Sequence, residues 1–181
     1  MGPPSDRPPT ADPGSLTRFQ RMLLGTDGTV THLLEAYADE PVEVVKLLQA
    51  FHTADDDAAD LHLSPDDKVL RRQILLRGRR SRQNLLYAEA VVAAGRVEAA
   101  FLDGLLETDE PIGVLLAHAR TETFREILRV AREPAGPLGP HFGLDTATEL
   151  IWRTYRIVCG GRPVILITEK FPPHLFRAVP I

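Results

Sequence analysis

The chain lacks the sequence features that indicate disulfide bonds, membrane insertion or secretion. It has one cysteine, Cys159, in 181 residues, so no internal disulfide can form and a reducing cytoplasm is the expected compartment. No apolar run approaches the ~20 residues that a membrane helix needs. The first residues also hold no signal-peptide core. We therefore expect a soluble cytoplasmic protein with no membrane partner.

Motifs for the common chemistries are also missing. The sequence contains no GxGxxG, no P-loop GxxxxGK, no HExxH and no GxSxG. Its six histidines show no metal-ligand spacing. A net charge of −4 supplies no positive field to recruit nucleic acid. These absences leave an enzyme that works through charge and shape, or a small-molecule binding domain, with no metal site and no nucleic-acid partner.

What the chain does contain is an ordinary globular composition, with 44% apolar and 25% charged residues. Residues 1–14 hold five prolines and are predicted to be a disordered tail. Residues 15–181 are long enough for one domain with a substantial core. No heptad or large apolar stripe is left over, so a monomer is expected.

Hydrophobic periodicity predicts about six strands and three or four helices. Strands are expected at 42–48, 69–76, 85–92 and 123–131, with two more between 152 and 173, and helices at 16–24, 29–37, 97–107 and 114–117. Hairpin connections dominate, and strands do not alternate regularly with helices. The pattern favours an α+β fold built on a single antiparallel sheet with helices packed against it.

The last predicted hairpin carries a carboxylate in an unusual place. Two runs rich in β-formers flank Gly160 and Gly161, which suit a two-residue turn. This turn places Trp152 opposite Glu169. Because side chains alternate along a strand, Glu169 shares a face with the apolar Ile165 and Ile167. A carboxylate at the end of an apolar row requires a partner, since burying an unpaired charge is costly.

A second strand carries the opposite charge in a similar row. Leu70, Arg72, Ile74 and Leu76 share one face, whereas Arg71 points to the other face as an ordinary outward charge. Two interpretations follow for the inward arginine and the inward glutamate. They can line a closed polar pocket, or they can form a structural salt bridge with each other.

Five short segments carry a resemblance to a known family. They are Gly28-Thr29-Val30-Thr31, Arg72-Gln73-Ile74-Leu75-Leu76, Glu110-Pro111-Ile112-Gly113, Glu122-Thr123-Phe124, and Arg153-Thr154-Tyr155-Arg156 through Ile167-Thr168-Glu169. In their order and spacing the chain, over roughly residues 16–177, resembles the chorismate pyruvate-lyase family. The similarity is strongest to the bacterial branch that makes 4-hydroxybenzoate. The resemblance implies one antiparallel sheet, flaps over a buried site, and elimination of pyruvate from chorismate without a metal or organic cofactor.

The resemblance also implies which residues form the site. Arg72 and Glu169 match the family's ligand-binding and catalytic pair, Val30 matches an apolar flap residue, and Ile112 matches a ligand contact. We also expect Arg156 to share the face of Glu169 and to support it. Two alternatives remain open: a sensor domain of the same fold that binds an aromatic acid, and a related enzyme that yields another hydroxybenzoate. The pathway that uses the product and the flap that opens are not predicted.

Overall fold

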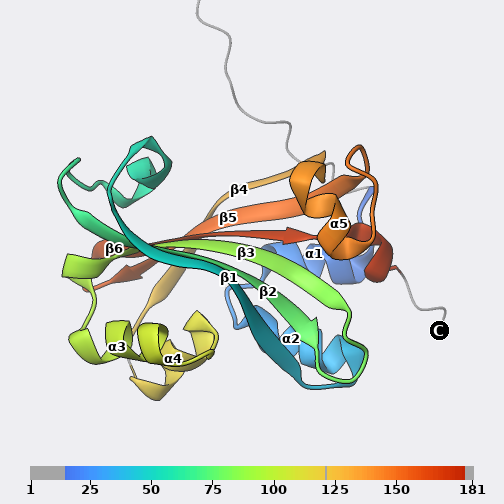
Figure 1. Cartoon of the computed structure of the whole chain (residues 1–181), viewed down its shortest axis with the longest axis horizontal. Coiled ribbons are helices and arrows are strands. Elements are labelled where there is room, and N and C mark those ends of the chain that lie inside the picture. The colour runs from blue at the N-terminus through green and yellow to red at the C-terminus, as the bar shows by residue number, and fades with distance from the viewer. Residues whose placement is uncertain (1–14, 121, 178–181) are drawn as a thin grey trace, which may run out of the picture.

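A computed structural model describes residues 15–120 and 122–177 of the chain. The predicted tail at 1–14 lies outside them, as does the end of the predicted domain at 178–181. Within the described residues six antiparallel strands form one sheet in the order β1-β2-β3-β6-β5-β4 (Figure 1). The strands are β1 (Val42–Thr53), β2 (Lys68–Gly78), β3 (Asn84–Ala93), β4 (Phe124–Pro134), β5 (Glu149–Cys159) and β6 (Arg162–Phe171). The predicted fold class is confirmed.

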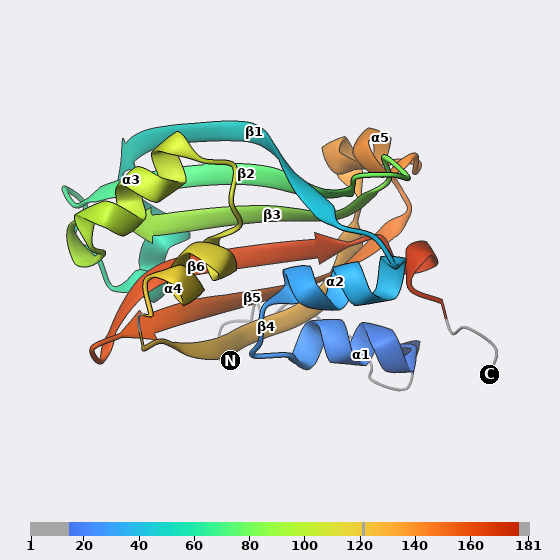
Figure 2. The ribbon, with the colours of Figure 1, turned by 90° about the horizontal axis from the view of Figure 1, so that it is seen from below.

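The α-helices of the described residues are α1 (Arg18–Gly25), α2 (Val30–Ala38), α3 (Ala99–Glu107), α4 (Ile112–His118) and α5 (Gly139–Phe142). Figure 2 shows α1 to α4 over the same face of the sheet. Helix α1 has Thr17 as its N-cap, and the Thr17 hydroxyl and the Gln20 side chain cap the helix reciprocally. The other face carries a 3₁₀ helix, η2 (Asp56–Leu61).

The apolar core on the helix-bearing face has two halves. One gathers under α1 and α2 around Leu34, Phe171 and Phe176, all fully buried. The other gathers under α3 and α4 around Leu105 and Ile165. Burial of these side chains is the main force that attaches the helices to the sheet. Between the two halves the face carries polar side chains, and the cavity described below lies there.

The final hairpin forms as predicted at its turn but not along its length. Gly160 and Gly161 both have positive φ, which the turn requires. A bulge then shifts the register between Ile157 and Val158. Glu169 consequently faces Arg153, and the predicted pairing with Trp152 is wrong by one residue. Since a shift of one residue exchanges the two faces of a strand, every face assignment on β5 also changes.

Candidate active site

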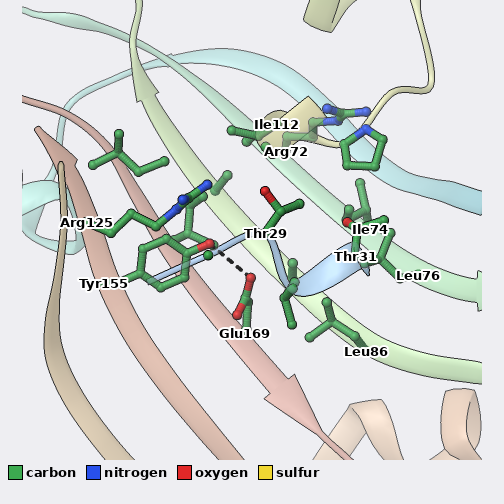
Figure 3. A pocket seen from close by; sticks show the side chains of 18 residues that line it. Thr29, Thr31, Arg72, Ile74, Leu76, Leu86, Ile112, Arg125, Tyr155 and Glu169 are labelled. Atoms are coloured by element: carbon green, nitrogen blue, oxygen red, sulfur yellow. Dashed lines mark hydrogen bonds between the residues drawn. The ribbon is translucent and has the colours of Figure 1, made fainter. Parts of the chain in front are cut away.

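A single cavity lies over the middle of the helix-bearing face (Figure 3), with about 560 Å³ of space including the part open to solvent. Five strands supply its floor, and the starts of α2 and α4 supply its roof. Its lining residues, most of them apolar, are Gly28, Thr29, Val30, Thr31, Arg72, Ile74, Leu76, Leu86, Ala88, Ala90, Pro111, Ile112, Gly113, Arg125, Tyr155, Ile157, Ile167 and Glu169. All four residues predicted for the site, Val30, Arg72, Ile112 and Glu169, are among them.

Small side chains in β3 make room for this cavity. Arg72 of β2 lies opposite Ala90, and Glu169 of β6 lies opposite Ala88. Arg72 and Glu169 therefore stand on two strands separated by one and offset by two residues, which places their backbones about 12 Å apart. The two alanines between them project only a methyl group. The floor is thus a shallow apolar trough with a guanidinium on one wall and a carboxylate on the other.

Arg72 is a buried cation whose hydrogen-bonding capacity is mostly unused. Only 1% of the residue is exposed, and its Nη1 donates to the Glu110 carbonyl oxygen at 3.1 Å. Its Nε and Nη2 have no hydrogen-bond partner among the residues that the structure describes. Burial lowers the pKa of Arg72, and the charge of Asp109 opposes part of that effect. A guanidinium with free donors in an apolar cavity is arranged to receive an anion.

Glu169, 3% exposed, is held by two neighbours on β5. The Arg153 Nε donates to its Oε2 at 2.7 Å, and the Tyr155 hydroxyl donates to its Oε1 at 3.0 Å. The salt bridge considered from the sequence is therefore wrong in its partner: Glu169 pairs with Arg153 and not with Arg72. These two donors fix the orientation of the carboxylate, which still faces the cavity (Figure 3).

Arg153 also connects this pair to the roof. Its Nη1 donates to the Thr26 carbonyl oxygen at 2.6 Å, just before the roof segment that contains Thr29 and Val30. The burial of Tyr155, together with the charge of Glu169, raises the pKa of its phenol well above the ordinary range. Tyr155 therefore remains a neutral hydrogen-bond donor to Glu169 at physiological pH.

The roof consists of two segments that meet above the floor. Thr29 caps the start of α2 without a side-chain hydrogen bond, and Pro111 precedes α4. A Cβ added at Gly113 would lie 3.0 Å from the Thr29 methyl group, so glycine permits this close approach. Val30, at 7% exposure, and Ile112 contribute apolar contacts from the two segments.

One predicted residue lies elsewhere, and three residues of the site were not singled out from the sequence: Arg125, Arg153 and Tyr155. Arg156 is on the opposite face, where it pairs with Glu126, because the bulge at Val164 of β6 shifts the expected register by one residue. Arg153 takes the supporting position instead. Arg125 of β4 lines the cavity but was not singled out, since an arginine in an edge strand with two more arginines has no distinctive pattern. Locating the β6 bulge at Val164 from the sequence would have identified Arg153 as the residue opposite Glu169.

Comparison with known proteins now adds to this geometry. The family model described as "Chorismate pyruvate-lyase Rv2949c-like" matches residues 23–179. The chain belongs to this chorismate pyruvate-lyase family. Among its curated relatives, the chorismate pyruvate-lyase of Mycobacterium tuberculosis is 31% identical over 169 residues, which cover 91% of this chain and 85% of the relative. The Mycobacterium leprae protein of the same name is 31% identical over 166 residues, covering 91% and 79%.

Solved structures show that the fold of this lyase family is shared more widely. The effector domain of PhnF from Mycobacterium smegmatis matches with a TM-score of 0.64 and 14% identity, over 81% of this chain and 90% of that domain. A GntR-family transcriptional regulator from Bacillus cereus matches with a TM-score of 0.61 and 14% identity, over 77% and 97%. At these identities only the fold is shared. No helix within the described residues is long and apolar enough to cross a membrane.

Proposed function

We propose that this chain is a chorismate pyruvate-lyase that converts chorismate to 4-hydroxybenzoate and pyruvate. One observation carries the proposal: a fully buried arginine with two free donors faces, across an apolar trough, a buried carboxylate of fixed orientation. An aromatic acid with a para hydroxyl has a carboxylate at one end and a hydrogen-bond donor at the other. Membership of the chorismate pyruvate-lyase family supports the same substrate class.

The two polar walls give the substrate its orientation. The Nε and Nη2 of Arg72 bind the ring carboxylate in a site that excludes water, where a charge-assisted hydrogen bond is strong. Glu169 accepts the hydrogen bond of the 4-hydroxyl group. The apolar roof residues Val30 and Ile112 pack on the ring. Arg153 and Tyr155 serve as positioning residues, because they hold both oxygens of Glu169 in place.

The reaction needs orientation and polarisation more than added reagents. The bond between ring C3 and the ether oxygen breaks, and the proton on C4 is lost, so the ring becomes aromatic. That proton is finally carried by the methylene carbon of the released enolpyruvyl group, which becomes the methyl group of pyruvate. Glu169 assists loss of the C4 proton through its contact with the 4-hydroxyl group. Closure of the roof excludes water and strengthens the polar contacts.

The test is to incubate purified protein with chorismate and identify the aromatic product by chromatography. Formation of 4-hydroxybenzoate with an equal amount of pyruvate supports the proposal. A different hydroxybenzoate isomer would indicate the related enzyme, and binding without turnover would indicate a sensor domain. The sensor alternative has one observation in its favour, since the matched regulator domains share the fold. We further propose a cytoplasmic monomer with chorismate and 4-hydroxybenzoate as its ligands and no cofactor.

A further inference from the structure

The charges in the cavity do not balance. The charged side chains among its lining residues are Arg72, Arg125 and Glu169. Glu169 is neutralised by Arg153 directly behind it. Arg72 and Arg125 make no ion pair with any residue that the structure describes; their protein contacts are to carbonyl oxygens. The cavity therefore presents two uncompensated positive charges.

The second of these cations is held in place and partly desolvated. Arg125 Nη1 donates to the Asp27 carbonyl oxygen at 2.6 Å, which fixes the guanidinium against the start of the roof. Its Nε is buried and has no hydrogen-bond partner within residues 15–120 and 122–177. Its Nη2 lies 3.5 Å from a Cβ built at Gly113, so the group sits under the junction of the two roof segments. Burying part of a guanidinium group without a counter-ion costs folding free energy, and a bound anion offsets that cost.

The position of Arg125 relative to Arg72 decides which anion it can meet. Arg72 is on β2, whereas Arg125 is on β4, the far edge of the sheet, opposite Ile157 of β5. Figure 3 shows Arg125 beside Tyr155 and on the side of Glu169, with Arg72 across the pocket. A ligand whose ring carboxylate binds Arg72 therefore brings its other end to Arg125.

We propose that Arg125 binds the carboxylate of the enolpyruvyl group, so that the cavity is a site for a dianion with its charges at opposite ends. This inference rests on the proposed function. In chorismate the enolpyruvyl ether is on C3, next to the C4 hydroxyl group that donates a hydrogen bond to Glu169. The enolpyruvyl group is therefore on the side of Arg125. The product 4-hydroxybenzoate has only the carboxylate that Arg72 binds. Arg125 thus distinguishes substrate from product, and Arg72 does not.

The experiment uses a pair of unreactive ligands that differ in this one carboxylate. They are 4-hydroxybenzoate and 3-(carboxymethoxy)-4-hydroxybenzoate, and their binding is measured by calorimetry to the wild type and to Arg125→Gln. In the variant we expect the affinity for the diacid to fall about 10- to 100-fold, the range for loss of a hydrogen-bonded charge. The affinity for 4-hydroxybenzoate should stay within error of the wild type.

The matched control is Arg129→Gln, which makes the same change on the same strand. Arg129 lies opposite Thr154 and pairs with Asp60 on the other face, so neither affinity should change. Equal weakening of both acids by Arg125→Gln would show that Arg125 only supports the roof and would overturn the inference. It is equally overturned if Arg125→Gln changes neither affinity, if Arg129→Gln reproduces the effect, or if the wild type binds neither acid. Selective loss of the diacid in a protein that does not turn over chorismate would refute the lyase proposal alone.

Discussion

The Arg153 guanidinium donates to the Glu169 carboxylate at 2.7 Å, from the adjacent strand and with both side chains buried. Because Glu169 pairs with Arg153, Arg72 on the other side of the cavity has no carboxylate partner in the described part of the chain. The inward arginine and glutamate visible in the sequence are thus two separate features. One is an ion pair completed within the protein, and the other is a buried cation whose contact among the described residues is the Glu110 carbonyl oxygen.

Arg72 should lower the stability of the ligand-free protein. Replacing it by methionine removes a buried, unpaired charge while keeping an apolar stem, so Arg72→Met should raise the free energy of unfolding by about 1 kcal/mol or more. Thermal unfolding with and without 4-hydroxybenzoate measures this. The wild type should gain stability from the ligand, and the variant should not. Arg71→Met is the control, since Arg71 is on the opposite face and pairs with Asp55. A variant that is less stable than wild type and still responds to the ligand would contradict this role.

The Arg153–Glu169 pair should be strongly coupled. Arg153→Met leaves a buried carboxylate unpaired and should cost about 3–5 kcal/mol. The double variant Arg153→Met/Glu169→Leu should cost much less than the two single changes added together. Urea unfolding of the full mutant cycle gives the coupling energy.

The control for this cycle is the pair Arg156–Glu126 on β5 and β4, which is partly exposed on the opposite face. Its coupling should be about 0–1 kcal/mol. Similar coupling energies for the two pairs would mean that burial does not distinguish them.

Tyr155 should make the protein less stable at alkaline pH. Burial and the charge of Glu169 raise its pKa in the folded state, whereas the unfolded chain titrates near pH 10. Below pH 10 the stabilisation that comes from the raised pKa of Tyr155 is fully present. Above it the unfolded state loses a proton that the folded state keeps, so stability falls by roughly 1.4 kcal/mol per pH unit.

Unfolding of the wild type and Tyr155→Phe between pH 8 and about pH 11.5, just above the ordinary tyrosine range, measures this effect. The variant should show the shallower decline. Tyr87 has a pKa shifted in the same direction and contributes equally to both proteins. Identical slopes would show that Tyr155 titrates normally in the folded state.

The product should inhibit the enzyme. After pyruvate leaves, 4-hydroxybenzoate still satisfies Arg72 and Glu169 beneath a closed roof, so its release should be slow. Initial rates of pyruvate release at several concentrations of added 4-hydroxybenzoate test this, with benzoate, which lacks the hydroxyl group, as the matched control. We expect strong inhibition by the product and weaker inhibition by benzoate. Rates that do not respond to 4-hydroxybenzoate would contradict a site matched to the product.

Much of the fold could be predicted from the sequence because local patterns determine it. Alternation along β2 places Arg72 inward and Arg71 outward correctly, and the paired glycines locate the last turn. The partner of Glu169 could not be predicted, because one extra residue in β6, Val164, shifts the register of the hairpin and no local pattern marks the bulge.

The second cation was missed for a related reason. The position of Arg125 in the cavity depends on segments distant in the chain. The Asp27 carbonyl oxygen accepts its hydrogen bond, and Gly113 lies above it. The pairing of the edge strand and the contacts between the roof segments belong to the tertiary structure. Periodicity within one strand does not report them.

The most direct test of the account is the rate at which an excess of protein converts chorismate in a single turnover. Wild-type protein should release pyruvate and 4-hydroxybenzoate in equal amounts, and Arg71→Met should do the same. Glu169→Gln should be slower by about 10²- to 10⁴-fold, the range for loss of a group that assists proton transfer, while circular dichroism shows an unchanged fold. Chorismate left intact by the wild type, or converted at the full rate by Glu169→Gln, would contradict the account.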